Sequence, residues 1–362
     1  MEQIAGANGF NLSDNEDRLV WIFGSSRSGS TWLLRMLSEI DGAVPIDDPH
    51  LGHHLGVWRP IPLAWATADS RPELTSLTEV KRNRRSYLFS DRYRNAWAPA
   101  LRHLIVTRFE AQACEVLAAR PQPAAHPLVI IKEPGSQVAD LILSLFPKSR
   151  MIFLLRDGRD VVDSWMAAHR PGSWALAEGA FAVAPEGRES LIRWQAAVWA
   201  YRTAVVQRAY RAHDPARRVM VRYEDMLCAP ARELRRVCES LAIEVPTERL
   251  ERIGREHSFS SVPRHERGAD KPIRSARPGG WRRHLTPAEQ RAMHEAMAER
   301  LAEVGYIPVQ ASNGLPKRAD GKPKLKAVPD SAVPPLPGPT EVGVDERLGG
   351  AEQPARPASD VR

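Results

Sequence analysis

The chain has 362 residues, enough for one large domain or two small ones, and carries 51 Lys and Arg against 44 Asp and Glu. The net charge of +7 suits an anionic ligand, but no zinc-ligand spacing and no alternation of basic and aromatic residues favours nucleic acid. No window approaches 18 uninterrupted apolar residues, which excludes a predicted membrane-spanning helix.

Composition also divides the chain into three predicted parts. Residues 310–362 contain nine prolines and no aromatic residue, so this tail is predicted to be disordered, with a docked extended arm as the alternative. Residues 1–16 are predicted to be disordered, and residues 17–309 to form the folded domain. The first 20 residues lack an apolar secretory core, and the three cysteines form no CxxC pair. We therefore predict a cytoplasmic protein with reduced cysteines.

Strand and helix patterns alternate along the predicted domain. Apolar, β-rich runs predict strands at 19–23, 128–132, 150–155 and 218–223. Helical patterns cover 31–40, 91–119, 136–145, 158–169, 189–213, 229–242 and 286–304. This alternation predicts an α/β protein, a P-loop-like three-layer fold with a central parallel sheet flanked by helices. The segments 47–90 and 170–188 have poor periodicity and are expected to build a ligand pocket or a lid.

A loop of small residues joins the first predicted strand to the first predicted helix. Gly24 and Gly29 bracket four residues, as in phosphate-binding loops of the form GxxxxGK[ST]. Backbone N–H groups of such a loop point toward an anion, and the following helix adds the partial positive charge of its N-terminus. Ser30 stands where a nucleotide triphosphatase carries Lys, and the cation of the loop is Arg27. The loop predicts phosphate or sulfate binding; the alternative is a structural corner with incidental serines.

A second motif follows the strand predicted at 150–155. Arg156 stands at its carboxyl end, where α/β sheets place ligands, and Ser164 lies eight residues later in the next predicted helix. An Arg and a Ser at this spacing suit a second anion. The alternative is that Arg156 and Asp157 cap the helix while Ser164 is simply exposed.

The two strings GSSRSGSTWLLRML and FLLRDGRDVVDSW resemble the nucleotide-binding motifs of sulfotransferases that use 3′-phosphoadenosine-5′-phosphosulfate (PAPS). An Arg in the loop is typical of the tyrosylprotein sulfotransferases and of many bacterial members. The resemblance implies that Arg27 contacts the phosphosulfate near its bridging oxygen and that Arg156 and Ser164 bind the 3′-phosphate. It also implies a set of residues around the 5′-phosphate: Ser26, Ser28, Gly29, Ser30, Thr31 and Trp32.

Three weaker similarities follow in the order expected for this family. Lys132, at the end of the strand predicted at 128–132, resembles the Lys that faces the transferred sulfuryl group, although a Lys at a strand end can also extend to solvent. Tyr223 begins a YEDM segment whose Tyr approaches the adenine, with plain core packing as the alternative. The string RSARPGGWRRHLT resembles the segment that covers the cofactor and includes Gly279. Ser275 and Ala276 replace its usual Lys and Gly, so either Arg274 or Arg277 is expected to hold the 3′-phosphate.

The resemblance implies sulfuryl transfer from PAPS to a hydroxyl or amine, without a metal ion. Arg27 and Lys132 are the cations expected to stabilise the leaving oxygen. The His that serves as base in cytosolic members is replaced by Pro134. Asp48, about where the tyrosylprotein branch carries its Glu, is the first candidate for the general base and His50 the second; a solvated turn is the alternative.

The acceptor is predicted to be a small molecule, a glycan or a lipid, and neither its identity nor the oligomeric state follows from the sequence. Two other functions compete with sulfuryl transfer. An ATP-dependent small-molecule kinase needs Lys at position 30, where this chain has Ser. A non-catalytic nucleotide-binding protein has the same loop without turnover.

Overall fold

The computed structural model describes residues 11–54, 60–62, 74–120, 127–177, 182–268, 271 and 276–307. The chain divides into two units, Met1–Val309 and Gln310–Arg362, and every described residue lies in the first. The tail 310–362, residues 1–10 of the segment 1–16 predicted to be disordered, and the candidate site residue Arg274 lie outside the described residues. Residues 11–16 of that segment are described, and Leu12 is fully buried in the core.

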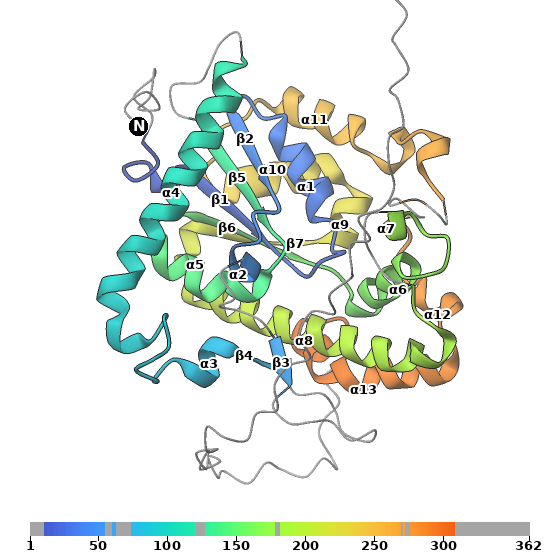
Figure 1. Ribbon diagram of the computed structural model, residues 1–362. Helices are drawn as coiled ribbons and strands as arrows, with labels where there is room; N and C mark the ends of the chain where they lie inside the picture. The colour runs from blue at the N-terminus through green and yellow to red at the C-terminus, as the bar shows by residue number, and fades with distance from the viewer. Residues whose placement is uncertain are drawn as a thin grey trace, which may run out of the picture. The chain divides into compact units, whose positions relative to one another are not determined.

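A five-stranded parallel sheet forms the centre of the first unit (Figure 1). Its strands lie in the spatial order β2 (Ala43–Asp47), β5 (Leu128–Glu133), β1 (Leu19–Phe23), β6 (Arg150–Leu155) and β7 (Arg218–Arg222). All four neighbouring pairs are parallel, which confirms the predicted α/β class. The sequence did not predict β2, because Pro45 argues against a central strand; Pro45 is tolerated here because β2 lies at the sheet edge.

The helices in the described residues are α1 (Ser30–Ser38), α2 (Leu51–His54), α3 (Leu77–Lys81), α4 (Arg94–Ala118), α5 (Ala139–Leu145), α6 (Gly158–Ala168), α7 (Trp174–Ala177), α8 (Arg188–Ala212), α9 (Tyr223–Cys228), α10 (Pro230–Ser240), α11 (Thr247–Glu256), α12 (Trp281–His284) and α13 (Pro287–Glu303). The helices predicted at 31–40, 91–119, 136–145, 158–169, 189–213, 229–242 and 286–304 are present as α1, α4, α5, α6, α8, α10 and α13, with ends within three residues of the predicted ones. The sequence did not predict α2, α3, α7, α9, α11 and α12. The irregular segment after β2 also contains an antiparallel pair, β3 (Pro60–Pro62) and β4 (Leu74–Ser76). Thr286 forms the capping box of α13 with Glu289.

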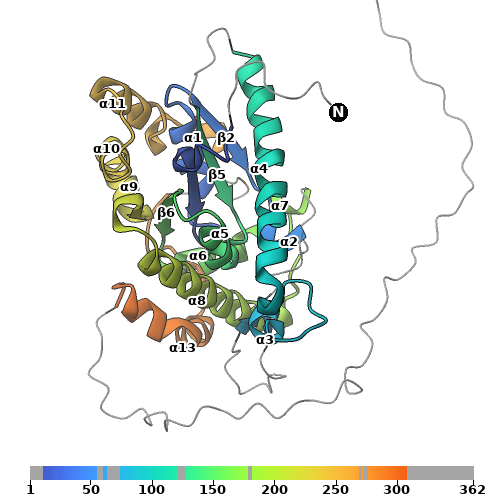
Figure 2. The same cartoon turned by 90° about the vertical axis from the view of Figure 1, so that its left-hand side faces the viewer.

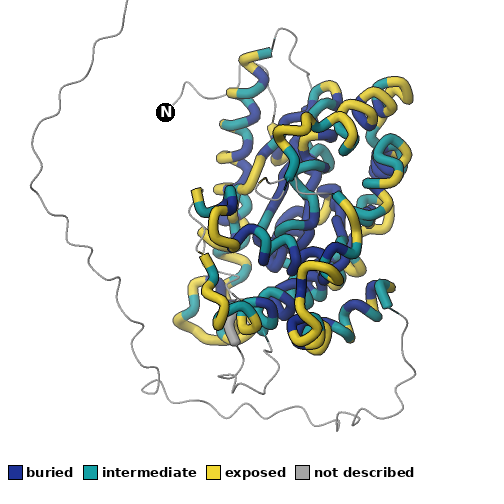
Figure 3. The backbone as a smooth tube through the Cα atoms, turned by 90° about the vertical axis from the view of Figure 1, so that its right-hand side faces the viewer, coloured by how far each residue is buried: buried dark blue, intermediate teal, exposed yellow. Residues whose placement is uncertain are grey.

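Each face of the sheet is covered by its own helices (Figure 2). Because side chains alternate along a strand, neighbouring residues of β1 belong to different clusters of buried side chains. Trp21 belongs to the cluster that includes residues of α4, α5, α6, α8 and α13, and Ile22 to the cluster that includes residues of α1, α10 and α11. Both side chains are fully buried. Figure 3 shows the resulting pattern, with buried strands and exposed outer surfaces on the helices. Burial on both faces explains why the central strands are continuous apolar runs.

The carboxyl ends of the strands place the predicted motifs at one edge of the sheet. β1 lies between β5 and β6, and the chain runs from β1 to one side of it and later crosses to the other. Open α/β sheets bind ligands where the strand order reverses in this way. The loop after β1, Lys132 at the end of β5 and Arg156 just after β6 therefore meet at this edge.

Candidate active site

The loop between β1 and α1 is shaped by close backbone packing. A side chain on Gly24 would place its Cβ 2.4 Å from the carbonyl oxygen of Leu154, so no other residue fits there without a shift. Gly29 has φ 93°, and its Cβ would lie 2.7 Å from the ring of Tyr223. Arg27 is also left-handed, with φ 71°. The glycines let the loop turn tightly and run directly into the N-terminus of α1.

The polar groups around this loop suit an anion. The N-cap residue of α1 is Gly29, and no side chain within the described ranges caps this helix N-terminus. The hydroxyl of Ser28 is buried and has no hydrogen-bond partner among the described residues. A buried polar group without a partner is costly, and an anion bound at the helix N-terminus would satisfy it.

Lys132 is the buried cation beside this loop. Its side chain is only 5% exposed, and its Nζ donates a hydrogen bond to the Thr31 hydroxyl over 2.8 Å. It also pairs with Asp47 at 2.6 Å and with Asp48 at 3.0 Å. Lys132 therefore joins three elements of the site: β5, the first turn of α1 and the end of β2.

The two sequence motifs come into direct contact. The Arg27 Nε donates to the Ser164 hydroxyl over 3.2 Å, and the Arg27 guanidinium lies 5.2 Å from the ring of Trp174. Arg156 donates to the backbone carbonyl of Arg27 over 2.7 Å, and its Nε is buried without a hydrogen-bond partner in the part of the chain that the structure describes. The loop cation Arg27 therefore contacts both members of the Arg156/Ser164 couple.

Aromatic rings form the neighbouring wall. Tyr223 lies against Gly29, with the guanidinium of Arg156 4.3 Å from its ring centre. Trp32 meets Tyr223 edge to face at 6.0 Å and donates its indole N–H to the carbonyl of His257 over 2.8 Å. Burial raises the pKa of Tyr223, so its hydroxyl stays neutral.

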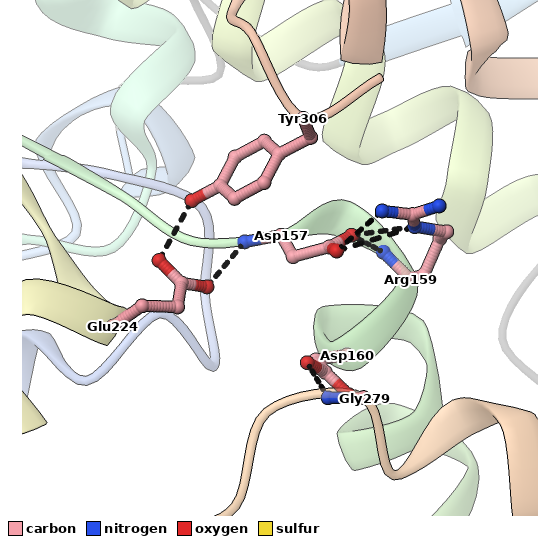
Figure 4. Close-up of polar contacts among 6 residues, drawn as sticks. All are labelled: Asp157, Arg159, Asp160, Glu224, Gly279 and Tyr306. Atoms are coloured by element: carbon pink, nitrogen blue, oxygen red, sulfur yellow. Dashed lines mark hydrogen bonds and ion pairs between the residues drawn. The ribbon is translucent and has the colours of Figure 1, made fainter. Parts of the chain in front are cut away.

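The C-terminal segment of the domain reaches the same area. Gly279 donates its N–H to the carboxylate of Asp160 over 2.7 Å (Figure 4), and burial raises the pKa of Asp160. Arg277, two residues before Gly279, is exposed. Of the two arginines predicted to hold the 3′-phosphate, Arg274 and Arg277, the structure describes Arg277.

The two candidates for the general base stand in one turn but in different surroundings. Asp48 and His50 flank Pro49 and both have positive φ, 49° and 50°. Asp48 pairs with Lys132, whereas His50 is exposed and its ring packs edge to face against those of His53 and His54. Asp48 is the candidate in contact with the buried cation.

Glu133 is a buried carboxyl that the sequence analysis missed. It is 1% exposed; its Oε2 accepts the Leu51 N–H over 3.0 Å and its Oε1 the Gly135 N–H over 2.8 Å. The pKa of Glu133 is raised to about 7, mainly by burial and in part by the nearby Asp48 carboxylate, while the hydrogen bonds from Leu51 and Gly135 oppose the rise. A Glu that continues an apolar strand directly after Lys132 was a usable signal for a perturbed carboxyl.

Arg202 of α8 is the second residue missed. Its Nη1 donates to the Ser26 hydroxyl over 3.1 Å and its Nε to the Gln137 amide oxygen over 2.9 Å. Burial lowers the pKa of Arg202 to about 10, and Glu133 opposes this shift. The signal in the sequence was its spacing, because Arg202 falls three residues after the buried Trp199, in the apolar stripe of α8.

Comparison with known proteins identifies the family. The profile of the sulfotransferase family matches residues 20–247. No curated protein sequence matches the chain. The chain belongs to the sulfotransferase family, and the matched region contains the loop, Lys132, Arg156, Ser164 and Tyr223.

Solved structures similar to this chain include three sulfotransferases. A mouse enzyme crystallised with PAP has 14% identity and TM-score 0.48, over 84% of this chain and 92% of that chain. A sulfotransferase domain from the olefin synthase of Synechococcus PCC 7002 has 19% identity and TM-score 0.44, over 81% and 95%. A Mycobacterium avium sulfotransferase has 17% identity and TM-score 0.45, over 83% and 81%.

Two further properties concern only the part of the chain that the structure describes. Within it, no helix is both long and apolar enough to cross a membrane. In the same ranges, no three His, Cys, Asp or Glu side chains are grouped so as to hold a metal ion.

Proposed function

We propose that this sulfotransferase transfers a sulfuryl group from PAPS to a hydroxyl or amine of an acceptor. The observation that carries the proposal is the meeting of the Gly24–Gly29 loop, Lys132 and the Arg156/Ser164 couple at one sheet edge. PAPS carries anionic groups at its 5′ and 3′ positions. The uncapped helix N-terminus suits the first group, and the guanidinium fork of Arg156 suits the second.

We assign the other residues predicted to bind the nucleotide according to where they lie in the fold. Ser26, Ser28, Ser30, Thr31 and Trp32 lie along the loop and the first turn of α1, around the proposed 5′-phosphate site. Tyr223 offers its ring to the adenine, and Gly279, Arg277 and Arg274 belong to the segment proposed to cover the nucleotide. The proposed acceptor is a small molecule, a glycan or a lipid.

In the proposed reaction the acceptor oxygen or nitrogen attacks sulfur while the bond from sulfur to the bridging phosphate oxygen breaks. The electron pair of that bond stays on the bridging oxygen, which leaves 3′-phosphoadenosine-5′-phosphate (PAP) as the product. Arg27 and Lys132 are proposed to stabilise this developing charge. Because Asp48 adjoins Lys132, we propose that its carboxylate takes the proton of the acceptor, and His50 is the second candidate.

Lys132 pairs with two carboxylates, Asp47 and Asp48, so Asp47 offers a matched control for the assignment of Asp48 as the general base. Asp48→Asn should lower turnover by at least about tenfold, whereas Asp47→Asn removes the other partner of Lys132 and should have a smaller effect. The measurement is the rate of PAP release at saturating PAPS. Full activity of Asp48→Asn together with loss of activity in His50→Ala would assign the base to His50.

Calorimetry and a transfer assay test the proposed function. PAP should bind at least about tenfold more tightly than AMP, because only PAP carries a 3′-phosphate. Labelled sulfate from PAPS should then appear in a product when the protein is incubated with an extract of the host cell. Binding without transfer would indicate a non-catalytic nucleotide-binding protein, and ADP formation from ATP with Mg²⁺ would indicate a kinase.

A cytoplasmic location is part of the proposal. It is supported by Cys114, Cys228 and Cys238, which carry free thiols as proteins of reducing compartments do.

A further inference from the structure

The C-terminal part of the domain, beyond the residues 20–247 that match the family, returns to the start of α6 (Figure 4). Gly279 binds the Asp160 carboxylate, and Trp281 lies 4.8 Å beneath the guanidinium of Arg159. Further along, the Tyr306 hydroxyl donates to Glu224 over 2.8 Å. These contacts hold the turn between β6 and α6 from two sides.

The carboxylate of Glu224 accepts two hydrogen bonds from different segments of the chain. Its Oε2 accepts the Tyr306 hydroxyl, and its Oε1 accepts the backbone N–H of Asp157 over 3.0 Å. Asp157 directly follows Arg156, and Glu224 directly follows Tyr223. The Glu224 carboxylate thus ties together the two chain segments whose side chains, Arg156 and Tyr223, stack at 4.3 Å.

Tyr306 is itself held in place. The guanidinium of Arg222 lies 4.8 Å from its ring centre, and Arg222 also donates to the carbonyl of Val304 over 2.6 Å. Burial and the adjacent Glu224 raise the pKa of Tyr306, so its hydroxyl remains a hydrogen-bond donor at every working pH. A carboxylate only accepts hydrogen bonds, so the direction of the contact is fixed from Tyr306 to Glu224.

We infer that Tyr306 is a positioning residue that, through Glu224, fixes Arg156 and thereby sets the preference of the site for a nucleotide with a 3′-phosphate. This inference rests on the proposed function, because it takes Arg156 as the group that binds that phosphate. An Arg binds phosphate strongly only when its fork is correctly oriented. Loss of the bridge should therefore weaken recognition of the 3′-phosphate and leave binding of the rest of the nucleotide intact.

The test compares Tyr306→Phe with the unchanged full-length protein by calorimetry, using PAP and AMP as probes. The hydrogen bond from Tyr306 to a charged group is lost, so PAP affinity should fall about tenfold and AMP affinity should stay the same. Tyr87→Phe is the matched control, since it also removes one hydroxyl hydrogen bond, the 2.7 Å contact with Thr78. Its ratio of PAP to AMP affinity should equal that of the unchanged protein.

The outcomes separate this inference from the proposed function. An unchanged ratio in Tyr306→Phe overturns the inference, whether or not the melting temperature falls. If Tyr306→Phe does not fold, Glu224→Met replaces it, because methionine has a side chain of similar length but its thioether is only a weak acceptor for the Tyr306 hydroxyl and the Asp157 N–H. An unchanged ratio in that variant also overturns the inference. If the unchanged protein binds PAP no better than AMP, the proposed function itself is wrong.

Discussion

Arg27 and Lys132 reach the loop from different parts of the chain, and their surroundings differ. Lys132 is enclosed and held by the Thr31 hydroxyl and two carboxylates. Arg27 belongs to the loop itself; its guanidinium donates a hydrogen bond to Ser164 and lies over the ring of Trp174. A fixed cation needs no reorganisation when negative charge develops nearby, which is the physical basis for assigning both to the leaving oxygen.

Arg27→Ala should lower turnover by about 10²–10³, the usual cost of removing one such donor, with little change in melting temperature. The measurement is the rate of PAP release at saturating PAPS. Arg35→Ala removes an exposed Arg from α1 and serves as the control, so its turnover should stay unchanged. Near-normal turnover of Arg27→Ala would contradict its assigned role.

Glu133 links stability to pH. Its pKa in the folded state is about 7, above the ordinary value of 4.5. Between pH 4.5 and 7 the Glu133 carboxyl is therefore protonated in the folded protein but ionised in the unfolded chain. Its contribution to stability is therefore fully present below about pH 4.5 and is lost as the pH rises toward 7, by about 3 kcal/mol. Glu133→Gln should remove this slope.

The measurement is the free energy of unfolding by denaturant at several pH values for both proteins. The difference between them cancels other titrating groups, among them His213, whose pKa burial lowers. Parallel curves for the two proteins would show that Glu133 has an ordinary pKa.

Among the secondary-structure elements, the close approach of the loop, α1 and α9 shapes the site. Gly29 joins the loop to α1, and the ring of Tyr223 at the start of α9 fills the space beside it. The missing Cβ of Gly29 allows both the left-handed backbone and this contact.

Gly29→Ala should therefore reduce PAP affinity by more than about tenfold, because the added Cβ would lie 2.7 Å from Tyr223. Gly172→Ala is the matched control, since Gly172 also has positive φ but a Cβ added there would meet no atom within 4 Å. Both variants carry the backbone cost of roughly 1–2 kcal/mol, and Gly172→Ala should still bind PAP normally. Equal PAP affinity in the two variants would rule out the steric argument.

At the scale of the whole molecule, the core can be located within the described residues. The two clusters of buried apolar side chains extend from Leu12 to Val304. Residues 310–362, with nine prolines and no aromatic residue, have little to add to such a core.

A chain that ends at Val309 should therefore keep the melting temperature and the PAP affinity of the full chain. Thermal unfolding and calorimetry of the two proteins, measured side by side, make the comparison. A lower PAP affinity after truncation would assign a role in nucleotide binding to residues 310–362.

Local patterns in the sequence were enough to predict most of the sheet and its motifs. The apolar runs at 19–23 and 150–155 became β1 and β6 with the predicted bounds, because strands buried on both faces need continuous apolar residues. Gly24, Gly29 and Arg156 were recognisable because their spacing from a strand end is local information. The strand β2 was not predicted, because Pro45 lacks a backbone N–H and makes the segment look unlike a strand, although an edge strand tolerates it.

The contacts and pKa values of the missed residues, in contrast, depend on the packing of distant segments. Glu133 has a pKa of about 7 because packing removes it from water, and Arg202 reaches Ser26 from 176 residues away. Tyr306 meets Glu224 in the same way, across 82 residues. Local patterns mark Glu133 and Arg202 as residues expected to be buried, but desolvation and long-range hydrogen bonds depend on how helices pack on the sheet. The partners of these residues and the sizes of their pKa shifts therefore follow only from the tertiary structure.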